Sequence, residues 1–206
     1  LGPVNSNSFF VGFGGPCEMQ NDGDPIVKYD RLADRWLISQ FAVRQGSPYY
    51  ECVAVSATPD PTAAYYRYSF SYRVFPDYPK IGIWPDGYYL TMAAFTSGTG
   101  SYLGPKTCVF NRSAMLTGAP ATQQCFDPAT PYGDLLMPSD LDGRNPHPAG
   151  APNYLAGLNW ATSPGSQLQV WKFHVDWSTP ANSTLTGPAL VNAPSYSIPC
   201  LSGGLC

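Results

Sequence analysis

The chain has 206 residues, a formal net charge of −3 at pH 7, 44% hydrophobic residues and 12% charged residues. This length is enough for one domain with a sizeable core, and the hydrophobic content excludes a disordered chain. An isoelectric point near 5.1 excludes the basic footprint of a nucleic-acid-binding protein. No apolar run approaches the roughly 18 residues that a membrane span needs.

Residue usage favours strands and turns over helices. Glutamate occurs only at Glu18 and Glu51, whereas the chain holds 20 glycines, 22 prolines and 14% aromatic residues. Good helix formers are therefore scarce, and residues that suit pleated surfaces and tight turns are abundant. The composition predicts an all-β fold.

The first residues, 1–15, are expected to be the outer strand of a preceding unit followed by a glycine-rich connection. A complete unit is expected over residues 16–73, and its four strands are predicted at residues 24–29, 36–43, 50–56 and 65–72. Turn residues such as Gly46-Ser47-Pro48 separate these strands.

Two further units repeat this plan. The second covers residues 74–130, with strands predicted at residues 80–84, 88–95, 107–111 and 121–126. The third covers residues 131–193, with strands predicted at residues 135–139, 153–159, 168–176 and 184–191. Residues 194–206 are expected to connect to a following unit.

The period of the repeat predicts a β-propeller. The units open at Asp24, Pro79 and near Ser139, with spacings of 55 and 60 residues. Four short strands per unit at this period are typical of propeller blades. Consecutive apolar residues in Cys52-Val53-Ala54-Val55 indicate a sheet covered on both faces, as a blade is by its neighbours. We therefore expect about three four-stranded blades, half of a six- or seven-bladed ring.

Several segments share a blade-like motif: Gly23-Asp24-Pro25-Ile26-Val27, Tyr29-Asp30, Ala33-Asp34-Arg35-Trp36, Asp77-Tyr78-Pro79-Lys80 and Trp171-Lys172-Phe173-His174-Val175-Asp176-Trp177. They resemble a little-characterised family of secreted bacterial β-propeller proteins. The resemblance implies an extracellular location and, as a partner, the remainder of the same propeller. It supplies no catalytic residues. In the turn Asp34-Arg35-Trp36, the aspartate is expected to satisfy turn amides and the tryptophan to pack between blades.

The cysteines predict a disulfide framework. Six are present, without the paired spacing that zinc ligation needs: Cys17, Cys52, Cys108, Cys125, Cys200 and Cys206. Pairing of nearest neighbours predicts the bonds Cys17–Cys52, Cys108–Cys125 and Cys200–Cys206. Disulfides indicate an extracellular or periplasmic location.

Two acidic pairs are candidate calcium ligands. Asp22 and Asp24, like Asp140 and Asp142, place carboxylates two residues apart beside a glycine at the start of a unit. Calcium takes six to eight oxygen ligands from flexible loops, and such pairs suit it. The alternative is that these aspartates bond backbone amides in their own turns.

The candidate ligand site combines charged residues at the unit openings. Asp24, Asp77, Lys80 and Asp140 are expected to converge at one mouth of a propeller channel, where polar groups bind ligands. The first functional hypothesis is an extracellular binding or scaffold module whose ligand is a glycan or a cell-surface protein. The alternative is part of a secreted carbohydrate-active hydrolase or lyase, with the carboxylates as acid and base. The scarcity of Glu and His favours the first.

Overall fold

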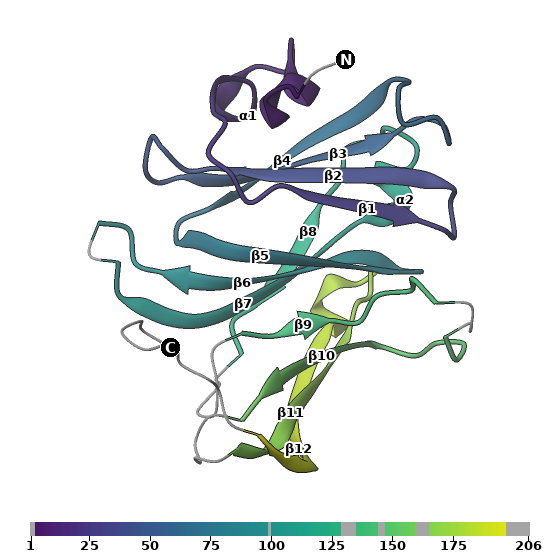
Figure 1. Cartoon of the computed structure of the whole chain (residues 1–206). Helices are drawn as coiled ribbons and strands as arrows, with labels where there is room; N and C mark the ends of the chain where they lie inside the picture. The colour runs from purple at the N-terminus through teal and green to yellow at the C-terminus, as the bar shows by residue number, and fades with distance from the viewer. Residues whose placement is uncertain (1–2, 99, 129–134, 144–146, 160–164, 197–206) are drawn as a thin grey trace.

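The computed structural model describes residues 3–98, 100–128, 135–143, 147–159 and 165–196. These residues form three four-stranded antiparallel sheets, in which each strand pairs with its neighbours along the chain (Figure 1). The all-β prediction is confirmed. No sheet in this part of the chain closes on itself.

The strands of the three sheets follow the predicted units. The first sheet consists of β1 (Ile26–Asp30), β2 (Arg35–Ala42), β3 (Tyr49–Ser56) and β4 (Tyr65–Tyr72). The second consists of β5 (Phe75–Trp84), β6 (Gly87–Phe95), β7 (Tyr102–Phe110) and β8 (Gln123–Phe126). The third consists of β9 (Met137–Pro138), β10 (Asn153–Leu158), β11 (Gly165–His174) and β12 (Thr184–Tyr196).

The helical elements are short. They are η1 (Ser6–Phe10), α1 (Gly15–Met19), α2 (Arg112–Met115) and η2 (Pro180–Asn182). None of these is long and apolar enough to cross a membrane.

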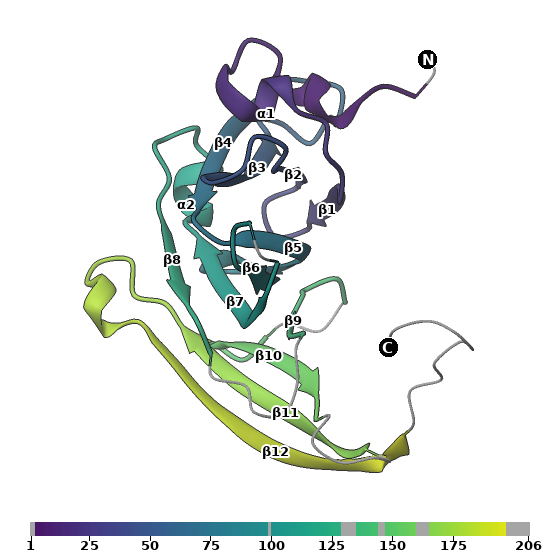
Figure 2. The ribbon, with the colours of Figure 1, turned by 90° about the vertical axis from the view of Figure 1, so that its left-hand side faces the viewer.

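The sheets follow one another in space as they do in sequence. Figure 2 shows β1, β5 and β9 toward one side of the molecule and β4 and β8 toward the other, while β12 forms the outer edge of the third sheet. The interface between the first two sheets is an apolar cluster that includes Leu37, Val55, Ile83 and Phe110. Burial of this cluster removes much apolar surface from water, which is the main favourable term in folding.

The second sheet is buried on both faces. In β6, every residue from Gly87 to Ala94 is buried. Alternate residues of this sheet contact opposite neighbours: Tyr88 and Leu90 belong to the cluster with the first sheet, and Tyr89 packs with Phe173 of the third. Burial on both faces thus explains the consecutive apolar residues of β6. In β3, for which the sequence predicted neighbouring blades on both faces, one face packs on the second sheet and the other on Phe10 and Cys17.

Residues 3–15 contain no strand, although an outer strand followed by a glycine-rich connection was predicted for residues 1–15. These residues form η1 and the start of α1, which cover the outer face of the first sheet with Phe10 and Cys17. The disulfide Cys17–Cys52 fixes this cover to β3. Glycines with positive φ, such as Gly12 and Gly14, break the extended backbone that a strand would need.

The predicted disulfides are confirmed within the described residues. Cys17–Cys52 closes a sequence separation of 35 residues, and Cys108–Cys125 joins the adjacent strands β7 and β8. The third predicted bond, Cys200–Cys206, lies outside the described residues.

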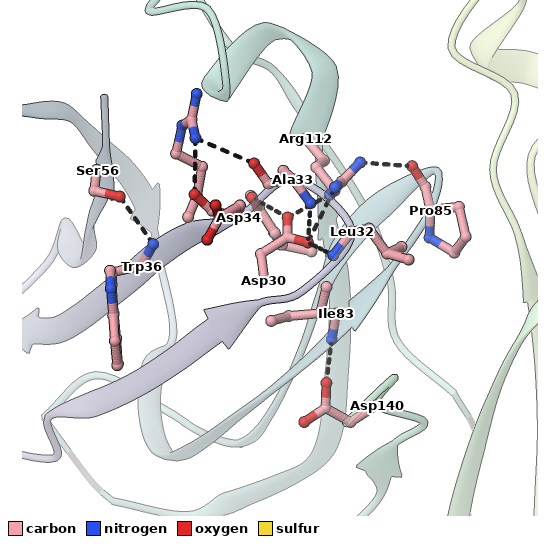
Figure 3. Close-up of polar contacts among 12 residues, drawn as sticks. Asp30, Leu32, Ala33, Asp34, Trp36, Ser56, Ile83, Pro85, Arg112 and Asp140 are labelled. Atoms are coloured by element: carbon pink, nitrogen blue, oxygen red, sulfur yellow. Dashed lines mark hydrogen bonds and ion pairs between the residues drawn. The ribbon is translucent and has the colours of Figure 1, made fainter. Parts of the chain in front are cut away.

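A buried carboxylate ties the first sheet to the second. Asp30, the last residue of β1, is fully buried and accepts hydrogen bonds from the backbone amides of Leu32 at 3.0 Å and Ala33 at 3.2 Å. It also accepts a hydrogen bond from the Tyr88 hydroxyl at 2.8 Å. Asp30 forms an ion pair with Arg112 at 2.6 Å (Figure 3). One side chain thus completes its own turn and fixes two elements of the second sheet's unit.

This network corrects the expectation for the turn Asp34-Arg35-Trp36. Asp30, and not Asp34, satisfies the turn amides, because Asp30 points inward whereas Asp34 accepts the Tyr29 hydroxyl at the surface. The Trp36 ring lies 5.0 Å from the Tyr29 ring within its own sheet, and its indole N–H donates to the carbonyl of Pro59. The tryptophan therefore does not pack between the first two sheets.

Replacement of Asp30 tests the network. We expect Asp30→Ala to lower the free energy of unfolding by about 3–5 kcal/mol, because Arg112 then remains buried without its partner. Urea denaturation measures this change. The matched control is Asp127→Ala, since Asp127 pairs with Lys106 but its side chain is 74% exposed. This control should cost less than about 1 kcal/mol, and equal losses in the two variants would contradict the assignment.

Candidate functional site

Two adjoining hollows open where β5 begins. Their volumes are about 380 Å³ and about 460 Å³, and both are lined by Asp77 and Phe95. The first is also lined by Tyr49, Phe75, Thr96, Gly98 and Gly100, and the second by Tyr78, Ala93, Tyr102 and Leu135. We call the two hollows together the Asp77 groove.

The backbone of β5 creates the groove. The pairing of β5 with β6 shifts register between Asp77 and Lys80, and Tyr78 adopts a positive φ of 52°. Such a bulge bends the strand and turns a side chain away from the regular alternation. Tyr78 is therefore exposed at the rim. The strand β5 begins at Phe75, before the predicted start at residue 80, because it pairs with β6 on both sides of the bulge.

Aromatic rings form a continuous wall. The Tyr49 and Phe75 ring centroids are 5.5 Å apart, those of Phe75 and Phe95 are 6.4 Å apart, and those of Phe95 and Tyr102 are 5.3 Å apart. The rings come from β3, β5, β6 and β7, so both the first and second sheets contribute. Ring edges and faces at these separations pack favourably and present a rigid apolar surface.

Charged side chains lie beside this wall. The Lys80 ammonium donates to the carbonyl of Pro79 at 2.9 Å and lies 3.2 Å from the centroid of the Tyr78 ring. Burial lowers the pKa of Lys80, and the nearby carboxylates of Asp24 and Asp77 partly offset this shift. Of the four ligand-binding residues that the sequence predicted, Asp77 lines both hollows, and Asp24 and Lys80 are not among the lining residues. Their convergence at one site stays a prediction.

Asp140, the fourth predicted residue, has a different environment. Its carboxylate accepts the backbone amide of Ile83 at 2.9 Å (Figure 3). It also pairs with Lys28 at 2.6 Å. Arg31 adds hydrogen bonds to the carbonyls of Asp142 and Gly143. These contacts connect the first and third sheets on the side where β1, β5 and β9 lie.

The predicted calcium ligands are distributed over two places. Asp22 accepts the backbone amides of Val43 and Arg44 and pairs with the Arg44 guanidinium at 2.6 Å. Asp140 is bonded to an amide and a lysine, as described above. Over the described ranges, no three His, Cys, Asp or Glu side chains form a group that could hold a metal ion. The calcium site at Asp22, Asp24, Asp140 and Asp142 stays a prediction.

Glu51 is a buried acidic residue that the sequence patterns did not single out as a candidate site residue. Glu51 on β3 is fully buried, and the Ser39 hydroxyl is the side-chain hydrogen-bonding group that acts on it. Burial raises its pKa to about 8, the neighbouring Ser39 lowers it in part, and the charge of Asp24 raises it further. A sequence signal did exist, because Glu51 stands within an apolar strand of a chain with only two glutamates.

Comparisons with protein-family models, with curated proteins and with solved structures returned no match. The function must therefore be argued from the geometry of the site.

The raised pKa of Glu51 predicts a stability that depends on pH. The folded protein holds the proton more tightly than the unfolded chain, in which the pKa is near 4.5. The contribution of this proton to the free energy of unfolding is therefore fully present below pH 4.5. This contribution is lost as the pH rises toward about 8. In buffer with a metal chelator, we expect the free energy of unfolding to fall by up to about 1.4 kcal/mol per pH unit in this window.

Glu51→Gln should remove this decline, because the amide does not titrate. Denaturant unfolding at a series of pH values measures it. Asp24 and Tyr72 are the charged and titratable neighbours that interact with Glu51, so Asp24→Asn serves as the second variant and should reduce the decline only in part. An unchanged decline in Glu51→Gln would assign the proton to another group.

Proposed function

We propose that this chain is an extracellular binding module of a β-propeller and that the Asp77 groove binds a glycan. The observation that carries the proposal is the pairing of one carboxylate with an aromatic wall in two hollows of ligand size. Aromatic rings stack on the apolar face of a sugar ring, and a carboxylate accepts hydrogen bonds from its hydroxyl groups.

The exposed tyrosines at the rim support a glycan over a purely apolar ligand. Tyr78 and Tyr102 are 50% and 39% exposed, and each combines a flat ring with a polar hydroxyl. The two hollows share Asp77 and Phe95, so neighbouring sugar units of one chain could each occupy one hollow. A cell-surface protein is the other ligand class, and it would reach the groove through the glycans or side chains that it presents.

The extracellular location is supported by the two disulfides, since these bonds persist in oxidising compartments. The propeller is supported by three consecutive four-stranded antiparallel sheets, with the first strand of each on one side of the molecule (Figure 2). On the third sheet, Met137 and Val191 are exposed. A further sheet of the same propeller would cover them, as the second sheet covers the first and the third covers the second.

A glycan array with the intact chain tests the proposal. We expect binding that Asp77→Ala abolishes, because Asp77 lines both hollows and, among the described residues, only one of its carboxylate oxygens accepts a hydrogen bond, from the Tyr78 amide. Tyr102→Ala should weaken binding about tenfold through the loss of one stacking ring. The matched control is Tyr154→Ala, since Tyr154 is exposed to a similar degree, 37%, on the third sheet away from the groove.

Two results would contradict the proposal: no binding to any glycan, or equal binding by the wild type and Asp77→Ala. A hydrolysis screen on the same glycans separates the binding module from the hydrolase or lyase. Cleavage of a glycan by the wild type that is lost in Asp77→Ala would favour the hydrolase or lyase.

A further inference from the structure

The Asp77 groove carries a negative charge that its own walls do not neutralise. Asp77 lines both hollows, and no lysine or arginine is among their described lining residues. The ion pairs in the described part of the chain use other carboxylates, those of Asp22, Asp30, Asp127 and Asp140. Within the same part, Asp77 accepts one hydrogen bond, from the Tyr78 amide at 2.9 Å. A carboxylate offers about four lone-pair sites, so most of this capacity is open to a ligand.

Strand pairing sets this carboxylate beside the aromatic wall. Phe75 on β5 pairs with Phe95 on β6, and the next pair on the same face is Asp77 with Ala93. Asp77 and Phe95 are therefore diagonal neighbours, and both line each of the two hollows. Because the residue opposite Asp77 is only an alanine, the space over Ala93 stays open and forms part of the second hollow. The junction of the hollows thus combines one charge with one ring.

A positive charge is the ligand group that satisfies both parts of this junction. The face of an aromatic ring is the negative end of its quadrupole, and it attracts an ammonium group within about 6 Å. A carboxylate accepts hydrogen bonds from the same group and adds an ion pair. The rim already shows such a contact, since the Lys80 ammonium lies 3.2 Å from the centroid of the Tyr78 ring.

Lys80 does not cancel the charge beside the groove. Its ammonium donates to the carbonyl of Pro79, and it forms no ion pair among the described residues. It interacts electrostatically with both Asp24 and Asp77, so one positive charge faces two negative ones and a net charge of −1 remains. The whole chain, with a net charge of −3, adds to this attraction for cations.

These observations narrow the ligand class of the glycan site. An acidic sugar would bring its carboxylate against Asp77, and like charges repel. An amino sugar supplies a ring that stacks on the aromatic wall and an ammonium group that pairs with Asp77. We propose that the Asp77 groove selects glycans with free amino groups, such as de-N-acetylated hexosamine polymers, over N-acetylated and acidic glycans. This inference rests on the proposed glycan binding and adds the charge of the ligand.

The position of Asp77 suits a polymer of such sugars. Asp77 lines both hollows, so the amino group of either of two neighbouring sugar units reaches the same carboxylate. Only one amino group in each pair of units is then needed for the ion pair. The selection therefore extends to partly de-N-acetylated chains.

Calorimetric titration of the intact chain with matched oligosaccharides tests the proposal. The probes are oligomers of glucosamine and of N-acetylglucosamine with the same length and linkage, at mildly acidic pH and low ionic strength. We expect the glucosamine oligomer to bind about tenfold more tightly, because only this oligomer carries ammonium groups. Added salt should narrow the ratio of the two affinities, since mobile ions screen charges in a partly exposed groove.

Asp77→Asn separates the charge from the shape of the site. Asparagine is close to aspartate in size and still hydrogen-bonds sugar hydroxyl groups, but it carries no charge. We expect this variant to bind the two oligomers with similar affinity, through an about tenfold loss for the glucosamine oligomer alone.

The matched control is Asp60→Asn, which removes the same charge elsewhere. Asp60 lies in the turn after β3, at the opposite end of that strand from Tyr49. Its side chain accepts the Thr62 amide, and the asparagine amide oxygen can accept the same hydrogen bond. This control should keep the preference of the wild type for the glucosamine oligomer.

The outcomes distinguish this inference from the proposed function. Equal affinity of the wild type for the two oligomers would overturn the inference and leave glycan binding intact. The same follows if Asp77→Asn keeps the preference, or if Asp60→Asn loses it, since the preference would then come from the overall charge of the chain. Absence of binding to either oligomer and to every glycan of the array would overturn both. Binding of a lysine-rich peptide but of no glycan would also overturn both and assign the groove to a protein ligand.

Discussion

The buried charge of Asp30 is the constraint on which the docking of the first two sheets depends. A carboxylate fully removed from water is tolerated only when charged and neutral donors surround it. Its donors come from its own turn, from Tyr88 on β6 and from Arg112 on α2. A shift of one sheet against the other would leave the charge unpaired. The local turn and the packing of the sheets are therefore stabilised by the same group.

Short polar side chains also fix the turn between the third and fourth strands of each sheet. Asp60 accepts the amide of Thr62, Asn111 accepts the amide of Ala114, and Asp176 accepts the amides of Ser178 and Thr179. These residues bond nearby backbone groups readily, which is why they favour turns. In the second sheet, this side-chain hydrogen bond to the turn amide also positions an ion-pair partner. Asn111 begins α2, and α2 presents Arg112 to Asp30.

The candidate sites follow from departures from this regular plan. The bulge in β5 exposes Tyr78 and opens the Asp77 groove, since a regular strand would keep the alternation of its side chains. Glu51 departs from the apolar pattern of β3 in the same region of the first sheet. Places where one local rule is broken while the surroundings obey it are expected to be functional.

The sequence by itself determined the all-β class, the three four-stranded units and the disulfides Cys17–Cys52 and Cys108–Cys125, because turn residues, apolar runs and cysteine spacing are local signals. Its prediction that Asp24, Asp77, Lys80 and Asp140 converge at one site stays a prediction. Only the tertiary structure decided that Asp30 accepts the turn amides, that Asp140 pairs with Lys28, and that Glu51 is fully buried. These contacts depend on strand register, on one bulge and on the stacking of separate sheets, and no short stretch of sequence encodes them.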